Sequence, residues 1–260
     1  MRYFLYKIFP SQFKRIYTDI RYNRFVKDNF IISSYPKSGS TYLRFLIFCY
    51  LTDSSPNYDL MEKFVPYVGP NDSKNSNFRK THELTSRYYT KGIYIRRDPR
   101  EIAWSSYRSL KRRKIYTKNF SNFLELFLND QISTYGDWHH HSLESSNFIK
   151  ENRNSWIVVE YNTLMKSPEL VLSRVLQHAD IDVSDVKLRS AVVNASVENV
   201  RNAEKKANQF SSLISKGYHP IVGDGNKLDW RSEMPSEYES KFKKLDILHN
   251  RSFWVAPDDA

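Results

Sequence analysis

Residues 30–51 constrain the fold of this chain most strongly, because a strand, a tight turn and a buried helix are predicted there in immediate succession. Phe30–Ser34 (FIISS) is a short apolar and β-branched run that ends before Tyr35-Pro36, which predicts a buried strand. After Gly39 and two hydroxyl residues, the sequence YLRFLIFCYL carries a single charge, which predicts a helix buried against a sheet. This order is the opening unit of a parallel α/β sheet.

The same unit recurs twice along the chain. Ile93–Arg96 is a second predicted strand, and Asp98-Pro99-Arg100-Glu101 after it supplies an N-cap, a first-turn proline and a capping-box glutamate. Trp156–Tyr161 is a third predicted strand, and Ser167-Pro168-Glu169 is expected to begin the helix that follows. The apolar face of a further amphipathic helix consists of Leu188, Ala191, Val192 and Ala195.

Composition bounds the size and the class of the protein. With 260 residues and 40% apolar residues, the chain is long enough for one large α/β domain with a substantial core. The single cysteine, Cys49, excludes an internal disulfide and a cysteine-based zinc site, and its apolar surroundings predict a buried, inert thiol. We therefore expect a reducing, cytoplasmic compartment. The sequence holds no continuous apolar run of about 18 residues, the length that a membrane span requires.

The net charge of +11 is concentrated in two segments. Residues 1–28 hold seven Lys or Arg against two Asp, and this basic N-terminal segment (residues 1–29) can either cover the sheet edge or lie peripherally on an anionic membrane surface. Residues 91–118 hold ten Lys or Arg against two acids. Such a field attracts nucleic acid, nucleotide phosphates, acidic glycans and lipids alike, so charge alone does not select a ligand.

The turn Tyr35–Tyr42 (YPKSGSTY) has the composition of an anion-binding loop. A helix N-terminus exposes unpaired N–H groups and the positive end of the helix dipole, which favours phosphate-like anions. Gly39 allows a close backbone approach, and Lys37 adds a point charge. Further donors are the hydroxyls of Ser38, Ser40 and Thr41. The loop is not a Walker A motif, because that motif places its lysine directly after a second glycine.

Two further clusters suit the same chemistry. Arg97 follows a predicted strand and Ser105 lies two turns into the next helix, so both can reach one phosphate monoester. Lys80-Thr81-His82 lies between the first two βα units, where His82 can act as a general base beside Lys80. Each cluster by itself also has a purely structural interpretation, because arginine-rich turns and lone histidines are common.

Together the clusters resemble the motifs of the sulfotransferases that use 3′-phosphoadenosine-5′-phosphosulfate (PAPS). The Tyr35–Tyr42 turn resembles the 5′-phosphosulfate loop of that family, Arg97 with Ser105 its 3′-phosphate motif, and Lys80-Thr81-His82 the KTH motif of its cytosolic branch. Weaker matches are Tyr161 to the tyrosine near adenine, Ser196 to the serine of the SFE stretch, and Asp229-Trp230 to the terminal GDW. The resemblance covers the chain from about residue 30 to residue 235.

The resemblance implies a P-loop-like α/β domain over residues 30–260, with a parallel sheet of about four or five strands flanked by helices. It also implies a reaction in which an acceptor hydroxyl attacks sulfur in line, His82 takes the proton, and Lys37 stabilises the bridging oxygen of the leaving nucleotide. Lys80 and the backbone amides from Ser38 to Tyr42 would hold the sulfuryl and 5′-phosphate oxygens. No metal is expected.

Three positions depart from the family pattern. The aromatic residue of the loop, often tryptophan, is Tyr42, which can still stack on adenine, and Val197 replaces the phenylalanine of SFE. Gly223-Asp224-Gly225 stands where the family has an Arg-Lys-Gly triplet. We expect Lys227 to replace the missing cations, with Lys216 as the second candidate. Both lie in Ser211–Arg231, whose three glycines and proline predict a long loop.

Two other functions explain parts of the sequence. A P-loop phosphotransferase would need a Walker A lysine and an acidic metal ligand, and neither is evident. A non-catalytic protein that binds polyanions or a membrane surface would explain the charge, including Lys111–Lys114, but not the ordered motifs. His139–His141 is a poor metal chelate, because adjacent residues on a helix point apart. We therefore expect a sulfotransferase that binds no nucleic acid and whose acceptor is a glycan, a glycolipid or a small metabolite; the basic surface favours the first two.

Overall fold

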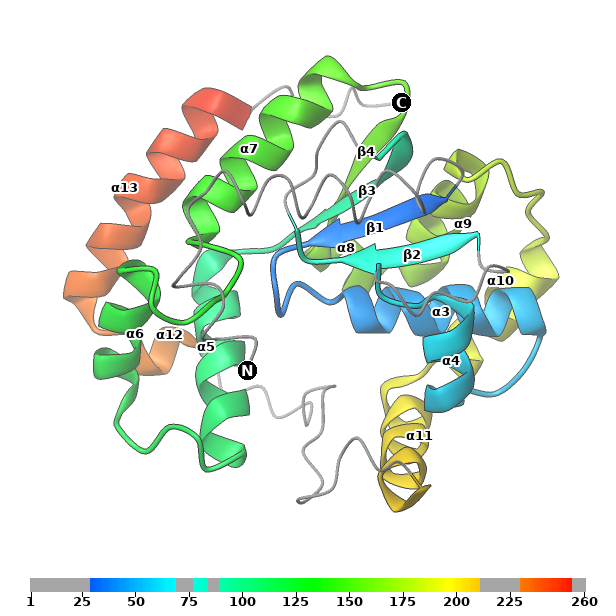
Figure 1. Cartoon of the computed structure of the whole chain (residues 1–260), viewed down its shortest axis with the longest axis horizontal. Coiled ribbons are helices and arrows are strands. Elements are labelled where there is room, and N and C mark those ends of the chain that lie inside the picture. The colour runs from blue at the N-terminus through cyan, green and yellow to red at the C-terminus, as the bar shows by residue number, and fades with distance from the viewer. Residues whose placement is uncertain (1–28, 69–76, 84–88, 211–229, 254–260) are drawn as a thin grey trace.

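A four-stranded parallel sheet forms the centre of the molecule, in the order β2-β1-β3-β4 (Figure 1). The computed structural model describes residues 29–68, 77–83, 89–210 and 230–253 of the chain. Its strands are β1 (Phe30–Ser34), β2 (Phe78–Thr81), β3 (Lys91–Arg96) and β4 (Trp156–Glu160). The parallel sheet with flanking helices confirms the fold class that the sequence predicts.

Helices connect the strands and cover the sheet on both faces (Figure 1). The bounds of these helices are α3 (Ser40–Thr52), α4 (Tyr58–Phe64), α5 (Pro99–Arg112), α6 (Phe120–Leu128), α7 (Trp138–Glu151), α8 (Tyr161–Lys166), α9 (Pro168–His178), α10 (Asp185–Asn194), α11 (Val197–Phe210), α12 (Trp230–Glu233) and α13 (Ser236–Phe253).

Alternation of side chains along the strands separates two layers of core. Ile32 and Ile95 point to one face, where they pack with apolar side chains of α3, α9 and α10. Ile31 and Tyr94 point to the other face and pack with Trp156 and with α7. The central strands are therefore buried on both sides, as is usual in parallel sheets.

A further apolar cluster lies beside the sheet, where α5, α6 and α13 meet. Figure 1 shows these helices grouped at the left of the molecule. Tyr35, the first residue after β1, places its ring in this cluster and donates a hydrogen bond from Oη to the carbonyl of Gly136 at 3.1 Å. The loop that follows β1 is thus anchored to the helices as well as to the sheet.

Most of the predicted element boundaries agree with the structure, and the end of the third predicted strand does not. Phe30–Ser34 is a strand as expected, and Asp98 caps α5 by accepting a hydrogen bond from the backbone N–H of Arg100 at 2.8 Å. Tyr161 was predicted to end the third strand, but it begins α8 instead. α9 begins after Ser167 with Pro168 and Glu169 in its first turn, as the sequence predicts, but the Ser167 side chain makes no capping hydrogen bond.

The residue-level expectations for Cys49 agree with the fold. Cys49 is buried in α3, and burial raises the pKa of its thiol to about 12, which keeps it protonated and unreactive. Among the described residues, no helix combines the length and the apolar character that crossing a bilayer would require. Residues 1–28 and most of the predicted loop Ser211–Arg231 lie outside the described part of the chain.

Candidate active site

The carboxyl ends of the four strands bring the predicted clusters to one edge of the sheet. His82 follows β2, the loop from Tyr35 to Gly39 follows β1, Arg97 follows β3 and Tyr161 follows β4. Because the strand order is β2-β1-β3-β4, the loop lies between His82 on one side and Arg97 on the other. Open parallel sheets bind their ligands at this edge.

The loop between β1 and α3 has a backbone conformation that few residues adopt. Lys37 has a φ of 73° and Gly39 a φ of 95°, both in the left-handed region. A Cβ atom on Gly39 would lie 2.6 Å from Cδ2 of Tyr161, so glycine is required for space as well as for its backbone angle. Gly39 caps α3 without a side-chain hydrogen bond, which leaves the first N–H groups of this helix available to a ligand.

Ser38 carries a buried hydroxyl without a partner in the loop. The residue is 1% exposed, and its Oγ makes no hydrogen bond within the described part of the chain. Buried polar groups are almost always hydrogen-bonded in native proteins, so an orphaned hydroxyl here indicates a ligand. Ser40 is buried in the next turn, and Thr41 is partly buried beside it. The loop therefore fits an anion with several oxygen acceptors.

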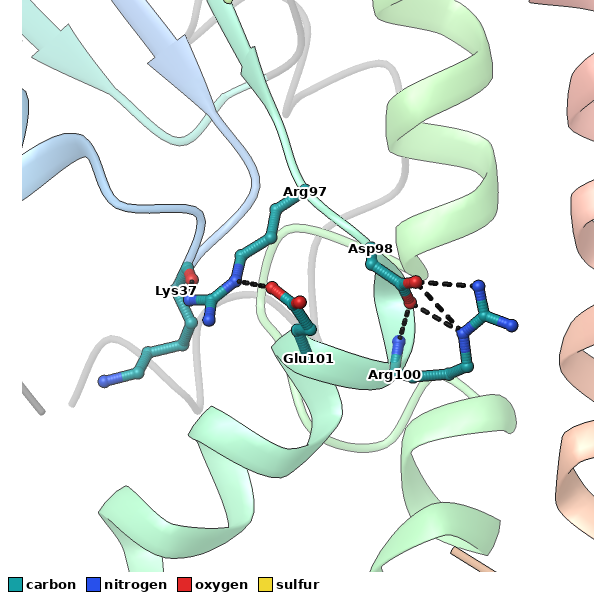
Figure 2. Close-up of polar contacts among 5 residues, drawn as sticks. All are labelled: Lys37, Arg97, Asp98, Arg100 and Glu101. Carbon is teal, nitrogen blue, oxygen red and sulfur yellow. Dashed lines mark hydrogen bonds and ion pairs between the residues drawn. The ribbon is translucent and has the colours of Figure 1, made fainter. Parts of the chain in front are cut away.

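Arg97 lies between this loop and the start of α5, as Figure 2 shows, and it also contacts the first residue of α8. Its Nη1 donates to the carbonyl of Lys37 at 2.8 Å, and its Nε donates to Oε2 of Glu101 at 2.9 Å. The guanidinium carbon lies 3.7 Å from the centre of the Tyr161 ring, which is a cation–π stack. Arginine has five N–H donors, so donors remain for an anion. Glu101 thus pairs with Arg97, although its spacing from Asp98 had predicted a capping box.

Lys37 points its ammonium group away from Arg97 and Glu101 (Figure 2). Burial, together with repulsion from Arg112 and Arg97, lowers the pKa of this lysine to about 8, and the buried Glu204 partly offsets these effects. Several cations around one acid form a positive field at the loop. Such a field attracts a multivalent anion.

Arg112 lies in the basic run Lys111–Lys114, which had not been assigned to this site, and Glu204 belongs to no predicted motif. Arg112 is the last residue of α5. It lies seven residues after the predicted site residue Ser105, which is partly buried in the same helix. Residues seven apart share a helix face, and this spacing was the available signal for Arg112. Glu204 lies in α11, and no local pattern marks it, because only tertiary packing brings it near Lys37.

Lys80 lies in β2 and is buried, with 2% of its surface exposed. Its Nζ donates to Oη of Tyr67 at 2.6 Å. Burial lowers the pKa of Lys80 well below its usual value, and the nearby Arg44 lowers it further. Arg44 is itself buried, pairs with Glu62 at 2.9 Å and donates from Nε to the carbonyl of Val65 at 2.8 Å. Lys80 therefore belongs to a buried network behind the loop, which sequence reasoning had not identified.

His82 follows Lys80 at the end of β2. Its Nδ1 lies 2.7 Å from the carbonyl oxygen of Ser34, and because a carbonyl only accepts, Nδ1 carries the proton. Burial, aided by the charge of Lys80, holds the pKa of His82 well below its usual value, so the ring is neutral at pH 7. Nε2 then holds a lone pair and has no partner within the described part of the chain. This is the protonation state that a general base requires.

The other predicted contacts to the nucleotide lie around the same edge or outside the described residues. Tyr42 is partly buried in the first turn of α3, and burial together with Tyr161 raises the pKa of its phenol. Ser196 precedes α11, and its Oγ accepts from the N–H of Asn199 at 3.4 Å. Lys216 and Lys227, the expected replacements for the missing cations, lie outside the described residues.

The three adjacent histidines of α7 point apart, as their positions on a helix predict. His140 is exposed, whereas His141 is fully buried and its Nε2 lies 3.0 Å from the carbonyl oxygen of His82. Among the described residues, no three His, Cys, Asp or Glu side chains gather in the way a metal site requires.

Curated relatives align with this chain over most of its length. Luciferin sulfotransferase from Photinus pyralis is 22% identical over 258 residues, which are 82% of this chain and 69% of the relative. Sulfotransferase 1 family member D1 from Rattus norvegicus is 22% identical over 244 residues, which are 84% of this chain and 81% of the relative.

Solved structures share the fold. Mouse sulfotransferase SULT7A1 complexed with PAP superposes with a TM-score of 0.67 at 22% identity, covering 88% of this chain and 86% of that one. Retinol dehydratase in a complex with retinol and PAP superposes with a TM-score of 0.72 at 16% identity, covering 94% of this chain and 87% of that one. At these identities the similarity shows the fold alone.

The family itself is shown by a sequence model of the sulfotransferase domain, which matches residues 27–245. The match includes the loop before α3, the end of β2 with His82, and Arg97 with Ser105. It covers more than half of the chain and agrees with the motifs on which the resemblance was based. The protein therefore belongs to the sulfotransferase domain family.

Proposed function

We propose that this protein transfers the sulfuryl group of PAPS to an acceptor hydroxyl. The loop before α3 carries the proposal, because unpaired helix amides, the buried hydroxyl of Ser38 and the charge of Lys37 meet there. The relatives support the donor, since mouse SULT7A1 and retinol dehydratase are both complexes with PAP, the nucleotide that PAPS leaves behind.

The donor would lie along the carboxyl edge of the sheet. The N-terminal amides of α3 and the Ser38 hydroxyl would hold the 5′-phosphosulfate, with Tyr42 against the adenine. Arg97 and Ser105 would hold the 3′-phosphate, because Arg97 keeps free N–H donors beside the loop. PAPS supplies a sulfur bonded through oxygen to phosphate, which leaves as a stable anion.

His82 would act as the general base. Its Nε2 takes the proton of the acceptor hydroxyl while the acceptor oxygen forms a bond to sulfur and the bond from sulfur to the 5′-phosphate oxygen breaks. The electron pair of the broken bond stays on that phosphate oxygen, where the Lys37 ammonium stabilises the charge. The hydrogen bond to the Ser34 carbonyl keeps Nε2 free of a proton before the reaction.

Lys80 would stabilise the sulfuryl oxygens during transfer. An ammonium group has three donors, so Lys80 can retain its bond to Tyr67 while it contacts a second oxygen. The buried Arg44, which pairs with the partly exposed Glu62, lies next to it in this network.

We take a sugar hydroxyl of a glycan or a glycolipid as the acceptor class. The rings of Tyr67 and Tyr135 flank His82 with centroid distances of 6.1 Å and 5.4 Å, and aromatic rings of this kind can pack against the C–H face of a sugar ring. The net charge of +11 favours partly anionic glycans over neutral small molecules. Transfer from sulfur-labelled PAPS to matched panels of acidic glycans, glycolipids and small phenols tests this choice.

The donor proposal is tested by nucleotide binding. We expect PAP to bind at least tenfold more tightly than 5′-AMP, because the lost contacts to the 3′-phosphate are charge-assisted and worth about 1.5–3 kcal/mol. ATP and single-stranded DNA serve as the comparison ligands for a phosphotransferase and for a polyanion-binding protein. Equal affinity for PAP and 5′-AMP would remove the main support for PAPS.

The base is tested by substitution at His82. We expect His82→Ala to keep its affinity for PAP and to lose about 10²–10⁴-fold in kcat, the usual contribution of a general base. Glu83→Gln is the comparison variant, since Glu83 is the carboxylate that directly follows His82 in the sequence. An active His82→Ala beside an inactive Glu83→Gln would transfer the role of base to Glu83.

A further inference from the structure

His141 contacts the main chain of the proposed base. It lies on α7, is 0% exposed, and places Nε2 at 3.0 Å from the carbonyl oxygen of His82. Its Nδ1 lies 3.2 Å from Oη of Tyr94, a residue of β3. The ring of Tyr35 packs edge-on against it with a centroid distance of 5.3 Å. One buried side chain thus joins α7 and β3 to the residue that follows β2.

The partners of His141 determine where its proton lies. The carbonyl of His82 can only accept, so Nε2 of His141 carries a proton. Burial lowers the pKa of His141 to about 4, so the ring is neutral at pH 7 and Nδ1 is an acceptor for the Tyr94 hydroxyl. The chain of donors therefore runs from Tyr94 through His141 to the carbonyl of His82.

His82 is consequently fixed at two points. Its ring donates from Nδ1 to the Ser34 carbonyl, and its own carbonyl accepts from His141. The residue after it is held by Thr81, whose Oγ1 accepts from the N–H of Glu83 at 2.9 Å, and by Ser33 at 3.3 Å. The carbonyl of His82 and the N–H of Glu83 form one peptide group, so His141 holds the oxygen of this group while Thr81 holds its N–H.

We propose that His141 is a positioning residue for sulfuryl transfer, which holds the backbone of His82 so that Nε2 of His82 faces the acceptor hydroxyl. The inference rests on the proposed function, because it assigns His82 as the base. A buried histidine often contributes packing alone, and in that case its substitution by phenylalanine would leave activity unchanged. Here the donated hydrogen bond, rather than the volume of the ring, is the functional element.

Two substitutions of His141 separate the donor from the ring. His141→Phe keeps the ring and loses the donor, whereas His141→Gln can place an amide N–H at the position of Nε2. We expect His141→Phe to lower kcat at least tenfold with the Kd for PAP changed less than threefold, and His141→Gln to recover most of the loss. The exposed neighbour gives the control, since His140→Phe should leave both values unchanged.

Several results would overturn the proposal. It fails if His141→Phe retains kcat within twofold, if His141→Gln is as slow as His141→Phe, or if kcat and PAP affinity fall together. Should His141→Phe not fold, Tyr94→Phe is used instead, because it keeps its ring and removes only the hydroxyl that faces Nδ1. That variant should lower kcat with unchanged PAP affinity, and an unchanged kcat in it counts against the proposal.

The nitrogen chemical shifts of the histidine rings test the geometry without turnover. At neutral pH we expect His82 as the Nδ1–H tautomer and His141 as the Nε2–H tautomer in the wild-type protein. In His141→Phe the His82 signals should change towards mixed tautomers. In His141→Gln they should stay as in the wild-type protein. Wild-type protein with these signals but no sulfuryl transfer would contradict the proposed function alone, whereas wrong wild-type tautomers would contradict the positioning role.

Discussion

The ring of Tyr161 occupies the space next to Gly39 so closely that a Cβ on Gly39 would lie 2.6 Å from its Cδ2 atom. The same ring carries the guanidinium of Arg97 on its face, at 3.7 Å from the ring centre. The first residue of α8 therefore sets the distance between the loop after β1 and the arginine after β3. This contact joins the two halves of the proposed donor site.

Gly39→Ala is expected to damage both stability and donor binding. The substitution places a Cβ at a φ of 95° and against the Tyr161 ring, and a strained backbone of this kind costs about 1–3 kcal/mol. We expect a lower free energy of unfolding and a Kd for PAP raised at least tenfold, measured by chemical denaturation and calorimetry. Gly136→Ala is the matched control, because Gly136 has a φ of 84° but no atom within 4 Å of an added Cβ. Equal affinities for PAP in the two variants would rule out the steric role of Tyr161.

The pH dependence of turnover follows from the neutral state of His82. Burial and Lys80 depress its pKa below 6.5, so the basic form persists as the pH falls through 6.5 and is lost only well below that value. We expect kcat at saturating PAPS to be similar at pH 7 and pH 6 and to decline at lower pH. Because a phosphate monoester itself titrates near pH 6, PAP affinity is measured over the same range as the control. A decline in kcat centred at or above pH 6.5 would contradict the depressed pKa.

Protein stability should fall in the same acidic range because of His141. The folded-state pKa of about 4 lies below the unfolded value near 6.5, so His141 contributes stability above pH 6.5, and this contribution is lost as the pH falls towards 4. Linkage predicts a loss of about 1.5 kcal/mol from this residue between pH 6.5 and pH 5. His141→Gln cannot titrate, so its unfolding free energy should depend less on pH by about that amount. Parallel curves for the two proteins would show that His141 does not titrate on unfolding.

Binding of the donor should change the protonation of Lys37. In the free protein its pKa is lowered to about 8, so about half of the molecules lack this charge at pH 8. A bound anion favours the ammonium form, so PAP binding at pH 8 to 9 should take up protons. Calorimetry in two buffers of different ionisation enthalpy measures the uptake, and Lys37→Met should abolish most of it. Proton release, or an unchanged uptake in Lys37→Met, would exclude Lys37 as a ligand of the donor.

Local sequence was sufficient for those parts of the site that lie on consecutive residues. The loop Tyr35–Tyr42 was predicted because its glycine, lysine and hydroxyls stand together between a strand and a helix. Arg97 and Ser105 were predicted for a similar reason, since one helix start separates them. Parallel strand topology then followed from the alternation of these units.

Tertiary contacts account for what the sequence did not predict. Glu204 approaches Lys37, and His141 reaches the carbonyl of His82, only because distant helices pack there. Glu101 fits a capping box in sequence, yet Arg97 offers a stronger, charged partner and takes the carboxylate. Tyr161 continues an apolar strand pattern, but the strand ends at Glu160 and the tyrosine starts a helix.

Arg97→Lys is expected to separate charge from shape at the proposed 3′-phosphate site. Lysine keeps the positive charge but has no planar fork, so it cannot hold the Lys37 carbonyl and Glu101 while it stacks on Tyr161. We expect the Kd for PAP to rise about tenfold or more, a loss within the 1.5–3 kcal/mol of hydrogen bonds to charged groups, while the Kd for 5′-AMP changes much less.

Arg100 supplies the matched control for this substitution. It lies three residues further on, and its guanidinium pairs with Asp98 at 2.7 Å, on the other side of the helix start (Figure 2). Arg100→Lys should therefore leave the preference for PAP over 5′-AMP intact. If Arg97→Lys changes neither affinity, the 3′-phosphate is recognised elsewhere, and Arg112 on the face of α5 that carries Ser105 becomes the next candidate. If Arg97→Lys weakens both nucleotides equally, Arg97 supports the loop without contacting the 3′-phosphate.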